Sequence, residues 1–331
     1  MTKTKTTTLS YFLGRTFFLG FGFSVLFKLL NKDTWIVAIL GSILGFLLLL
    51  FFERFKEKHP INSVVKKGLF LLYNFFIFSQ ILFIFETFCS SFYLIKSPIF
   101  YIILPIPFVI YKITKNGFST IAKVAEVLLP ISLFIYVLVI FGLFKDMNLD
   151  YFQPVLTANP QDIAIGTIYF ALYSTAPFFL LWNVNTDKKL AKSYFLSMVS
   201  VFFVSIFITG ILGPNLSQIY RFPEYMTMKK IKLFNFIEKV ENIVSITWLF
   251  SLFITLSVTG WNMKELLPQK KNNILYIGVL ILLCFISLYT GTHYQKELWI
   301  YHTLPILLGV MMLILVLVSI LPRNKKELNR K

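Results

Sequence analysis

The sequence predicts an all-helical integral membrane protein with about ten transmembrane helices. Of its 331 residues, 57% are hydrophobic and 14% are charged. Soluble domains hold about 45–50% apolar and about 25% charged residues, so this chain lies outside that range in both respects. Apolar runs of about 20 residues, the length needed to cross a bilayer, recur along the chain. Lys and Arg fill the gaps between the runs, as is typical of multi-pass membrane proteins.

Ten apolar runs meet or nearly meet the required length. They are expected at residues 9–30, 35–52, 68–94, 98–111, 120–144, 163–183, 193–213, 236–262, 274–290 and 298–321. The fourth run is short and holds Pro98, Pro105 and Pro107, which predict a kink or a misplaced boundary. The first run contains Arg15 and has no small-residue cleavage site after it, so it is interpreted as a retained helix and not as a signal peptide. The chain is predicted to be a single polytopic domain.

The placement of charge predicts that both termini are cytoplasmic. With the amino terminus inside, about two thirds of the 32 Lys and Arg residues fall in cytoplasmic segments. Because these residues are spread between the helices, the net charge of +17 does not indicate nucleic-acid binding. The exception is the outer loop 214–235, which carries Arg221, Lys229 and Lys230. Its pattern, with Ile219, Phe222 and Met226 as apolar positions, predicts an amphipathic segment lying on the membrane surface.

Two of the predicted helices are interrupted. Gly14, Gly20 and Gly22 interrupt the first helix, and residues 174–177, Ser-Thr-Ala-Pro, interrupt the sixth. Interruptions five helices apart are expected of a 5+5 inverted repeat, with halves at about 9–144 and 163–321 and a substrate site between the breaks. Glycine is also common in membrane helices because it permits close packing, and this alternative stands equally.

An interrupted helix leaves backbone N–H and C=O groups free, which is tolerated only where they line a cavity. The backbone of residues 20–22 would hold a substrate carboxylate beside the positive end of the following half-helix. Hydroxyl groups near residue 174 would face it from the other break. The predicted ligand-binding residues are therefore Gly20, Phe21, Gly22, Tyr173, Ser174 and Thr175. Such a site suits a zwitterionic amino acid.

Ionisable residues inside the apolar runs are candidates for proton coupling or gating, because a buried charge is costly in a bilayer. They are Arg15, Glu86, Lys123, Glu126, Glu238 and Glu241. Arg15 and Glu126 have similar predicted depths and opposite charges, which favours an ion pair, or Arg15 and Lys123 extend to the cytoplasmic interface instead. Glu86, the most deeply placed acid, either carries a coupling proton or makes a structural hydrogen bond. Glu238 and Glu241 either form a gate or are ordinary interfacial residues.

Enzyme signatures are absent from the sequence. It contains no HExxH, GxSxG or Walker loop, and its three histidines and two cysteines lack metal-ligand spacing. Neither a metal nor another cofactor is expected. A membrane-embedded enzyme acting on lipid or polyisoprenoid substrates would need clustered catalytic residues in a large interfacial loop, and the longest loops show none. The chain is expected not to be an enzyme.

The stretch at residues 222–248 reads FPEYMTMKKIKLFNFIEKVENIVSITW. It resembles the B-subunit family of spore germinant receptors, which are permease-like members of the amino acid–polyamine–organocation superfamily. The shared pattern is an aromatic-Pro-x-Tyr start, a basic amphipathic link, then F-x-E-[RK]-x-E and a Trp. The matching residues are Phe222, Pro223, Tyr225, Phe236, Glu238, Lys239, Glu241 and Trp248. Weaker similarities are DTWIVAILGSILG at 33–45, KVAEVLLP at 123–130 and FQPVL at 152–156.

The resemblance implies a leucine-transporter-like fold with an inverted repeat and broken helices 1 and 6. It also implies an amino-acid-type ligand, a place in the inner membrane of a bacterium or spore, and other germinant receptor subunits as partners. The first functional hypothesis is a permease-like protein that binds a small amino acid or similar germinant, as the sensor or transport subunit of such a receptor. The second is a proton-coupled amino acid transporter not involved in germination.

Overall fold

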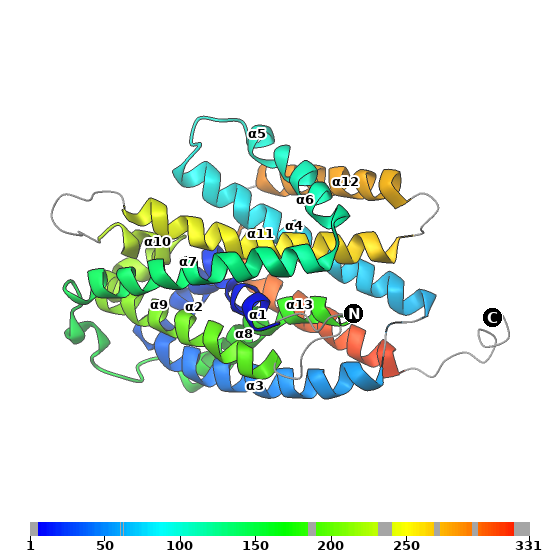
Figure 1. The fold of residues 1–331 in the computed structure, drawn as a ribbon. Coiled ribbons are helices and arrows are strands. Elements are labelled where there is room, and N and C mark those ends of the chain that lie inside the picture. The colour runs from blue at the N-terminus through cyan, green and yellow to red at the C-terminus, as the bar shows by residue number, and fades with distance from the viewer. Residues whose placement is uncertain are drawn as a thin grey trace.

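The structure is a computed structural model that describes residues 6–59, 61, 63–184, 190–230, 240–267, 272–292 and 297–320. All elements in these ranges are helices. In chain order they are α1 (Thr6–Arg15), η1 (Phe18–Gly22), α2 (Phe23–Leu30), η2 (Asn31–Asp33), α3 (Thr34–Lys58), α4 (Val64–Phe92), α5 (Ile99–Ile103), α6 (Pro105–Lys115), α7 (Phe118–Phe144), η3 (Leu149–Phe152), α8 (Pro160–Thr175), η4 (Ala176–Leu181), α9 (Leu190–Ile219), α10 (Pro223–Met228), α11 (Val240–Leu266), α12 (Asn272–Thr292) and α13 (Glu297–Ile320). The long helices run along one bundle (Figure 1).

Within the described ranges, seven helical stretches are long and apolar enough to cross a membrane. They are Phe23–Lys58, Val64–Phe92, Phe118–Phe144, Pro160–Leu181, Leu190–Ile219, Glu241–Leu266 and Thr303–Ile320. A shorter apolar helix spans Asn273–Ile286. The prediction of a multi-pass, all-helical membrane protein is therefore confirmed, whereas the count of ten crossings stays a prediction.

Three of the ten expected runs are not among these seven stretches. The first run is divided into α1 and α2 by η1, and the fourth is divided into α5 and α6. Pro105 occupies the first turn of α6, where its missing N–H costs nothing, so the expected kink is a boundary between two helices. The ninth run is the shorter apolar part of α12.

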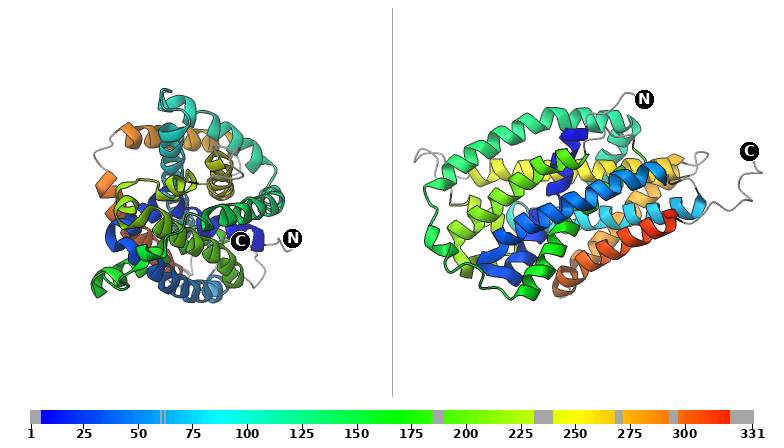
Figure 2. Two further views of the ribbon diagram at one scale, coloured as in Figure 1. Left: turned by 90° about the vertical axis from the view of Figure 1, so that its left-hand side faces the viewer. Right: turned by 90° about the horizontal axis from the view of Figure 1, so that it is seen from below.

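The short helix α1 lies near the middle of the bundle, in contact with α7, α8, α9 and α11. The views along and across the bundle show α1 entering it from one side, next to the long helix α7 (Figure 2). Gly14 permits this position, because a Cβ atom there would lie 2.3 Å from the Ser197 side-chain oxygen of α9. Gly14 therefore lies within a regular helix and serves close packing, so its expected part in the interruption is corrected.

The segment that was expected to lie on the membrane surface is buried at α10, whereas Ile219 before this helix and Lys229 and Lys230 after it are exposed. Helix α10 packs against α9 and α11, and Glu224 and Tyr225 are almost wholly inaccessible. Its aromatic residues Phe222 and Tyr225 join Phe88 and Trp248 in a second apolar cluster of the protein. Of the three predicted apolar positions, Phe222 is buried against protein and Met226 is partly buried, whereas Ile219 is exposed. Residues 231–235 of the segment lie outside the described part of the chain.

The turn before α3 is fixed by a buried carboxylate. The two carboxylate oxygens of Asp33 accept the backbone N–H groups of Leu156, Thr157 and Ala158 at 3.0, 2.6 and 2.8 Å. The hydroxyl of Thr157 donates a fourth hydrogen bond, at 3.0 Å. Asp33 thus joins the turn η2 to the loop that precedes α8. This contact brings together residues 33–45 and 152–156, two of the stretches with weaker similarity to the family.

Candidate functional site

The first interruption separates α1 from α2 and is built on two glycines. Residues Phe18–Gly22 form a single π-helical turn, in which the Gly22 N–H donates to the Phe17 carbonyl at 2.8 Å. Gly20 has φ +114°, a backbone conformation that side chains disfavour. A Cβ atom on Gly22 would lie 2.8 Å from the Phe17 carbonyl oxygen. The predicted interruption is therefore present, and both glycines are needed for its geometry.

A carboxyl group from a distant element holds this interruption. The Gly20 N–H donates a 2.7 Å hydrogen bond to Oε1 of Glu224, which α10 supplies. Glu224 is 0% exposed, and its Oε2 has no hydrogen-bond partner among the described residues. Burial raises the pKa of Glu224 from its ordinary 4.5 to about 8, although the N–H groups of Gly20 and of Glu224 itself act in the opposite direction.

The second interruption ends α8 at Thr175 and continues as the 3-10 turn η4. Pro177 lies at its start and has no N–H to donate. The carbonyl groups of this turn are met by donor side chains. The Tyr73 hydroxyl donates to the Ala176 carbonyl, and the Asn262 amide donates to the Leu180 carbonyl, each at 2.7 Å.

The carboxyl end of η4, which is predicted to face the cytoplasm, and the residues that follow it make further contacts. The Lys56 ammonium donates to the carbonyls of Leu181 and Val184 at 3.5 and 3.4 Å. The Trp182 indole N–H donates to the His59 carbonyl at 3.0 Å. These contacts come from α3 and from the residue that follows it, so the turn is anchored at both ends by neighbouring elements.

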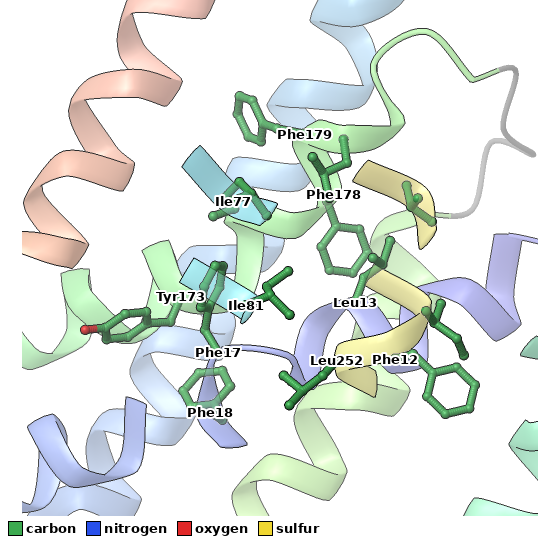
Figure 3. Close-up of a cluster of buried hydrophobic side chains, with 14 of the residues drawn as sticks. Phe12, Leu13, Phe17, Phe18, Ile77, Ile81, Tyr173, Phe178, Phe179 and Leu252 are labelled. Carbon is green, nitrogen blue, oxygen red and sulfur yellow. The ribbon is translucent and has the colours of Figure 1, made fainter. Parts of the chain in front are cut away.

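The two interruptions lie against each other in the apolar core. The Phe17 and Tyr173 rings are 6.2 Å apart between centroids, and those of Phe18 and Phe170 are 4.5 Å apart. Figure 3 shows Phe17, Phe18, Tyr173 and Phe178 in one apolar cluster with Ile77, Ile81 and Leu252. The described side chains between the interruptions are therefore packed, and the arrangement is a closed one.

The predicted ligand-binding hydroxyls lie at this junction and bond to their own surroundings. The Ser174 hydroxyl donates to the Ala171 carbonyl at 2.9 Å and lies 2.7 Å from the Tyr194 hydroxyl. The Thr175 hydroxyl donates to the same carbonyl at 2.7 Å. Both residues are buried, as is Tyr173. The side chain of Phe21 lies outside the described part of the structure.

Arg15 ends α1 in a position that differs from both expectations for it. Its guanidinium donates to the Tyr11 hydroxyl and lies 4.8 Å and 5.4 Å from the ring centroids of Tyr11 and Tyr136. It is 2% exposed, so it does not extend to the interface. Within the described residues it forms no ion pair with Glu126, which is half-buried on α7 beside an exposed Lys123. The negative faces of two tyrosine rings and the carboxyl end of α1 surround the charge instead.

The remaining candidate acids lie on α4 and α11 or outside the described residues. Glu86 is buried on α4, and Glu241 is half-buried in the first turn of α11. Glu238 and its neighbour Lys239 lie outside the described residues.

Sequence reasoning missed Glu224. The search for charges inside apolar runs passed over it, because it stands in a loop between two predicted helices. The available signal was its position between Pro223 and Tyr225, within the stretch that carries the resemblance. Burial of both neighbours marks this stretch as part of the protein interior.

Comparisons with known proteins agree with the resemblance. No curated protein matches the chain. A family described as spore germination protein, a spore permease family, has a model that matches residues 4–295. The match includes both interruptions, α10 and the aromatic cluster of Phe222, Tyr225 and Trp248. The chain therefore belongs to the spore germination protein family of permease-like membrane proteins.

Proposed function

We propose that this protein binds a small amino acid or similar germinant between its two helix interruptions, as the sensor or transport subunit of a spore germinant receptor. The proposal includes ten membrane crossings, an inverted repeat of residues 9–144 and 163–321, and cytoplasmic termini in the inner membrane of a bacterium or spore. Other receptor subunits would be its partners. Membership of the spore germination family supports this direction.

The complementary chemistry of the two interruptions carries the proposal. The first offers a backbone N–H group, which an acidic side chain satisfies. The second offers carbonyl groups, which Tyr73 and Asn262 satisfy with donors. An amino acid has one group of each kind, since its carboxylate accepts hydrogen bonds and its ammonium group donates them. Two facing breaks of opposite character therefore match a zwitterion.

The described arrangement represents the closed state of this proposed site. Glu224 holds the Gly20 N–H, and apolar rings fill the space beside Tyr173. A ligand carboxylate would take that N–H from Glu224, and the Ser174 and Thr175 hydroxyls would turn from the Ala171 carbonyl towards the ligand. A ligand that binds only the open arrangement shifts the equilibrium towards it and so signals to associated subunits.

Thermal stabilisation of the purified protein across a panel of amino acids, sugars and nucleosides tests the ligand class. Thr175→Val removes a hydroxyl but keeps the shape of the side chain. We expect it to weaken amino acid binding about tenfold, the effect of one lost hydrogen bond to a charged group. Titrations of the stabilising amino acid against each variant measure this change.

Thr167→Val is the matched control for that titration. Thr167 lies on the same helix, and its hydroxyl also donates to a carbonyl four residues earlier, that of Ile163, at 2.7 Å. It should bind the ligand like the wild type. Equal affinities for the two variants, or stabilisation by sugars or nucleosides alone, would contradict a site between the interruptions.

A second candidate function is proton-coupled amino acid transport unrelated to germination. The buried Glu224 favours it, because its raised pKa lets it take up and release a proton near neutral pH. Uptake of labelled amino acid into proteoliposomes, driven by an imposed pH gradient, would support transport. Ligand binding without uptake would support the sensor.

A further inference from the structure

Glu224 differs from the buried Asp33 because few hydrogen-bond donors reach its carboxyl group. The Gly20 N–H is bonded to its Oε1 at 2.7 Å, and Oε2 has no partner in the described part of the chain. The buried Asp33 differs, since four donors reach its two oxygens. An ionised carboxylate needs several donors once it is removed from water. Glu224 lacks them, so the packed arrangement favours its neutral form.

No basic side chain compensates Glu224 in the described residues. The ionisable residues beside it on its own segment are Arg221, Tyr225 and Lys229, and the last two meet through the Tyr225 ring. The elements packed against α10 carry Lys28 on α2, Lys192 and Tyr194 on α9, and Glu241, Lys264 and Glu265 on α11. Glu86 and Cys89 lie on α4, whose Phe88 and Phe92 rings pack against Tyr225. The pKa of Glu224 is set by its burial and by backbone N–H groups. None of these side chains contributes to it.

The contact of Glu224 joins two parts of the chain that are 204 residues apart. Gly20 lies at the centre of the first interruption, and Phe222 covers the place where a Gly20 Cβ would be, at 3.2 Å. Helix α10 thus closes over the interruption from one end of the bundle. Ionisation of Glu224 in this position would require water or a cation, and either needs α10 to move away from Gly20.

We infer that Glu224 is a proton-binding site that holds α10 closed over the first helix interruption and releases it when the proton is lost. Its use in coupling ligand binding to protons rests on the proposed function. The proton site itself does not depend on which ligand binds. The ligand assigned to this site is a proton, and the acid that carries it is Glu224.

The direction of the pH effect follows from the two states. In the closed state the pKa of Glu224 is about 8, and in an open, hydrated state it returns towards its ordinary 4.5. As the pH rises between these values, the open state loses its proton while the closed state keeps it. The closed state is therefore fully favoured below about pH 4.5, and its advantage declines up to about pH 8.

Hydrogen exchange of the Gly20 amide measures this opening directly, because that N–H is the one bonded to Glu224. The experiment follows a peptide that contains Gly20 by mass spectrometry, in ligand-free protein, between about pH 5 and about pH 8. We expect its opening constant to rise about tenfold or more in the wild type, beyond the intrinsic change in exchange rate. Glu224→Gln keeps an oxygen that accepts from Gly20 but has no titratable proton, so its opening constant should stay flat.

A control variant at another buried acid allows the result to contradict the inference. Glu86→Gln changes another buried acid and should keep the wild-type pH dependence. If Glu86→Gln removes the dependence while Glu224→Gln retains it, the proton belongs to Glu86 and the inference is wrong. The inference is also wrong if the opening constants of the wild type and of Glu224→Gln change with pH in the same way.

If Glu224→Gln does not fold, hydrogen exchange of the wild-type protein alone still tests the inference. A peptide from α3 in the same sample then supplies the reference, and equal pH dependence of the two peptides would overturn the inference. Because no ligand is present, failure of the amino acid panel leaves this result unaffected. A flat profile, in turn, leaves ligand binding between the interruptions untouched.

Discussion

The two helix interruptions are held by partners of opposite character. At the first, a backbone donor on Gly20 meets the acidic Glu224 from α10. At the second, the backbone acceptors of Ala176 and Leu180 meet the donors of Tyr73 and Asn262. The first is a π turn built on glycine, and the second is a 3-10 turn that begins beside a proline. The side chain that bonds to each turn indicates the kind of ligand group that the turn can bind: a hydrogen-bond acceptor at the first and a donor at the second.

The two interruptions also differ in how their bonds to these partners respond to pH. At the second interruption the Tyr73 hydroxyl and the Asn262 amide are neutral groups, so their bonds to Ala176 and Leu180 are unchanged near neutral pH. The Lys56 ammonium adds longer contacts at the far end of this turn. The first depends on a carboxyl group that holds its place while protonated. The first interruption is thus the switchable half of the proposed site, and the second is the fixed half. Three substitutions compare the stability of the two halves.

Gly20→Ala should have the largest effect, because it acts on the first interruption in two ways. A side chain is strained at φ +114°, and its Cβ would lie 3.1 Å from Ile84. Strain of this kind costs roughly 1–3 kcal/mol of unfolding free energy. Unfolding of the purified protein in mixed micelles, followed by tryptophan fluorescence, measures the loss.

Gly68→Ala is the control for this change. Gly68 lies in α4, where an added Cβ meets nothing within 4 Å. Alanine there should stabilise the helix by about 0.5–1 kcal/mol. Losses of similar size at both glycines would mean that Gly20 has no special role in the interruption.

Asn262→Leu tests the fixed half and should have an intermediate effect. The change removes the donor to the Leu180 carbonyl, and a buried carbonyl that loses its partner costs about 1–3 kcal/mol. We expect a loss near 2 kcal/mol in the same unfolding assay. The loss should be the same at about pH 5 and about pH 8, in contrast to changes at Glu224.

Asn74→Leu supplies the comparison for that variant. Asn74 is also buried, but its amide donates only to the Phe70 carbonyl of its own helix, and its Oδ1 has no partner among the described residues. Removal of this amide should be close to neutral. A loss at Asn74 equal to that at Asn262 would show that the Leu180 contact contributes nothing particular.

The sequence was sufficient for the positions of both interruptions but not for their partners. Gly20, Gly22 and Pro177 have local conformational effects, so their consequences can be predicted without tertiary structure. Glu224 and Asn262 act through contacts with residues far away in the chain, which no local pattern records. The same limit explains Phe222 at the start of α10, which was expected to face the membrane surface and packs against protein instead.

For the membrane spans, too, local features could be predicted from the sequence and long-range contacts could not. Long apolar runs can be recognised from composition, and seven of the ten expected runs correspond to spans among the described residues. The number of crossings could not be settled in this way, because the first and fourth runs are divided into short helices. The Arg15–Glu126 pair failed for a related reason. Equal depth and opposite charge do not specify the rotation of each helix, and Arg15 instead faces the rings of Tyr11 and Tyr136.

Tyr73→Phe should have the smallest effect of the three and gives the finest test of the fixed half. It removes one hydroxyl donor from the Ala176 carbonyl and leaves the ring in place, which costs about 1 kcal/mol. Tyr276→Phe is the control, because its hydroxyl lies 3.0 Å from the Thr114 hydroxyl, which keeps its own bond to the Ile110 carbonyl. That loss should not exceed about 0.5 kcal/mol. If Tyr73→Phe is as mild as its control, the Ala176 carbonyl is satisfied without Tyr73, and the second interruption depends on Asn262 for its anchoring donor.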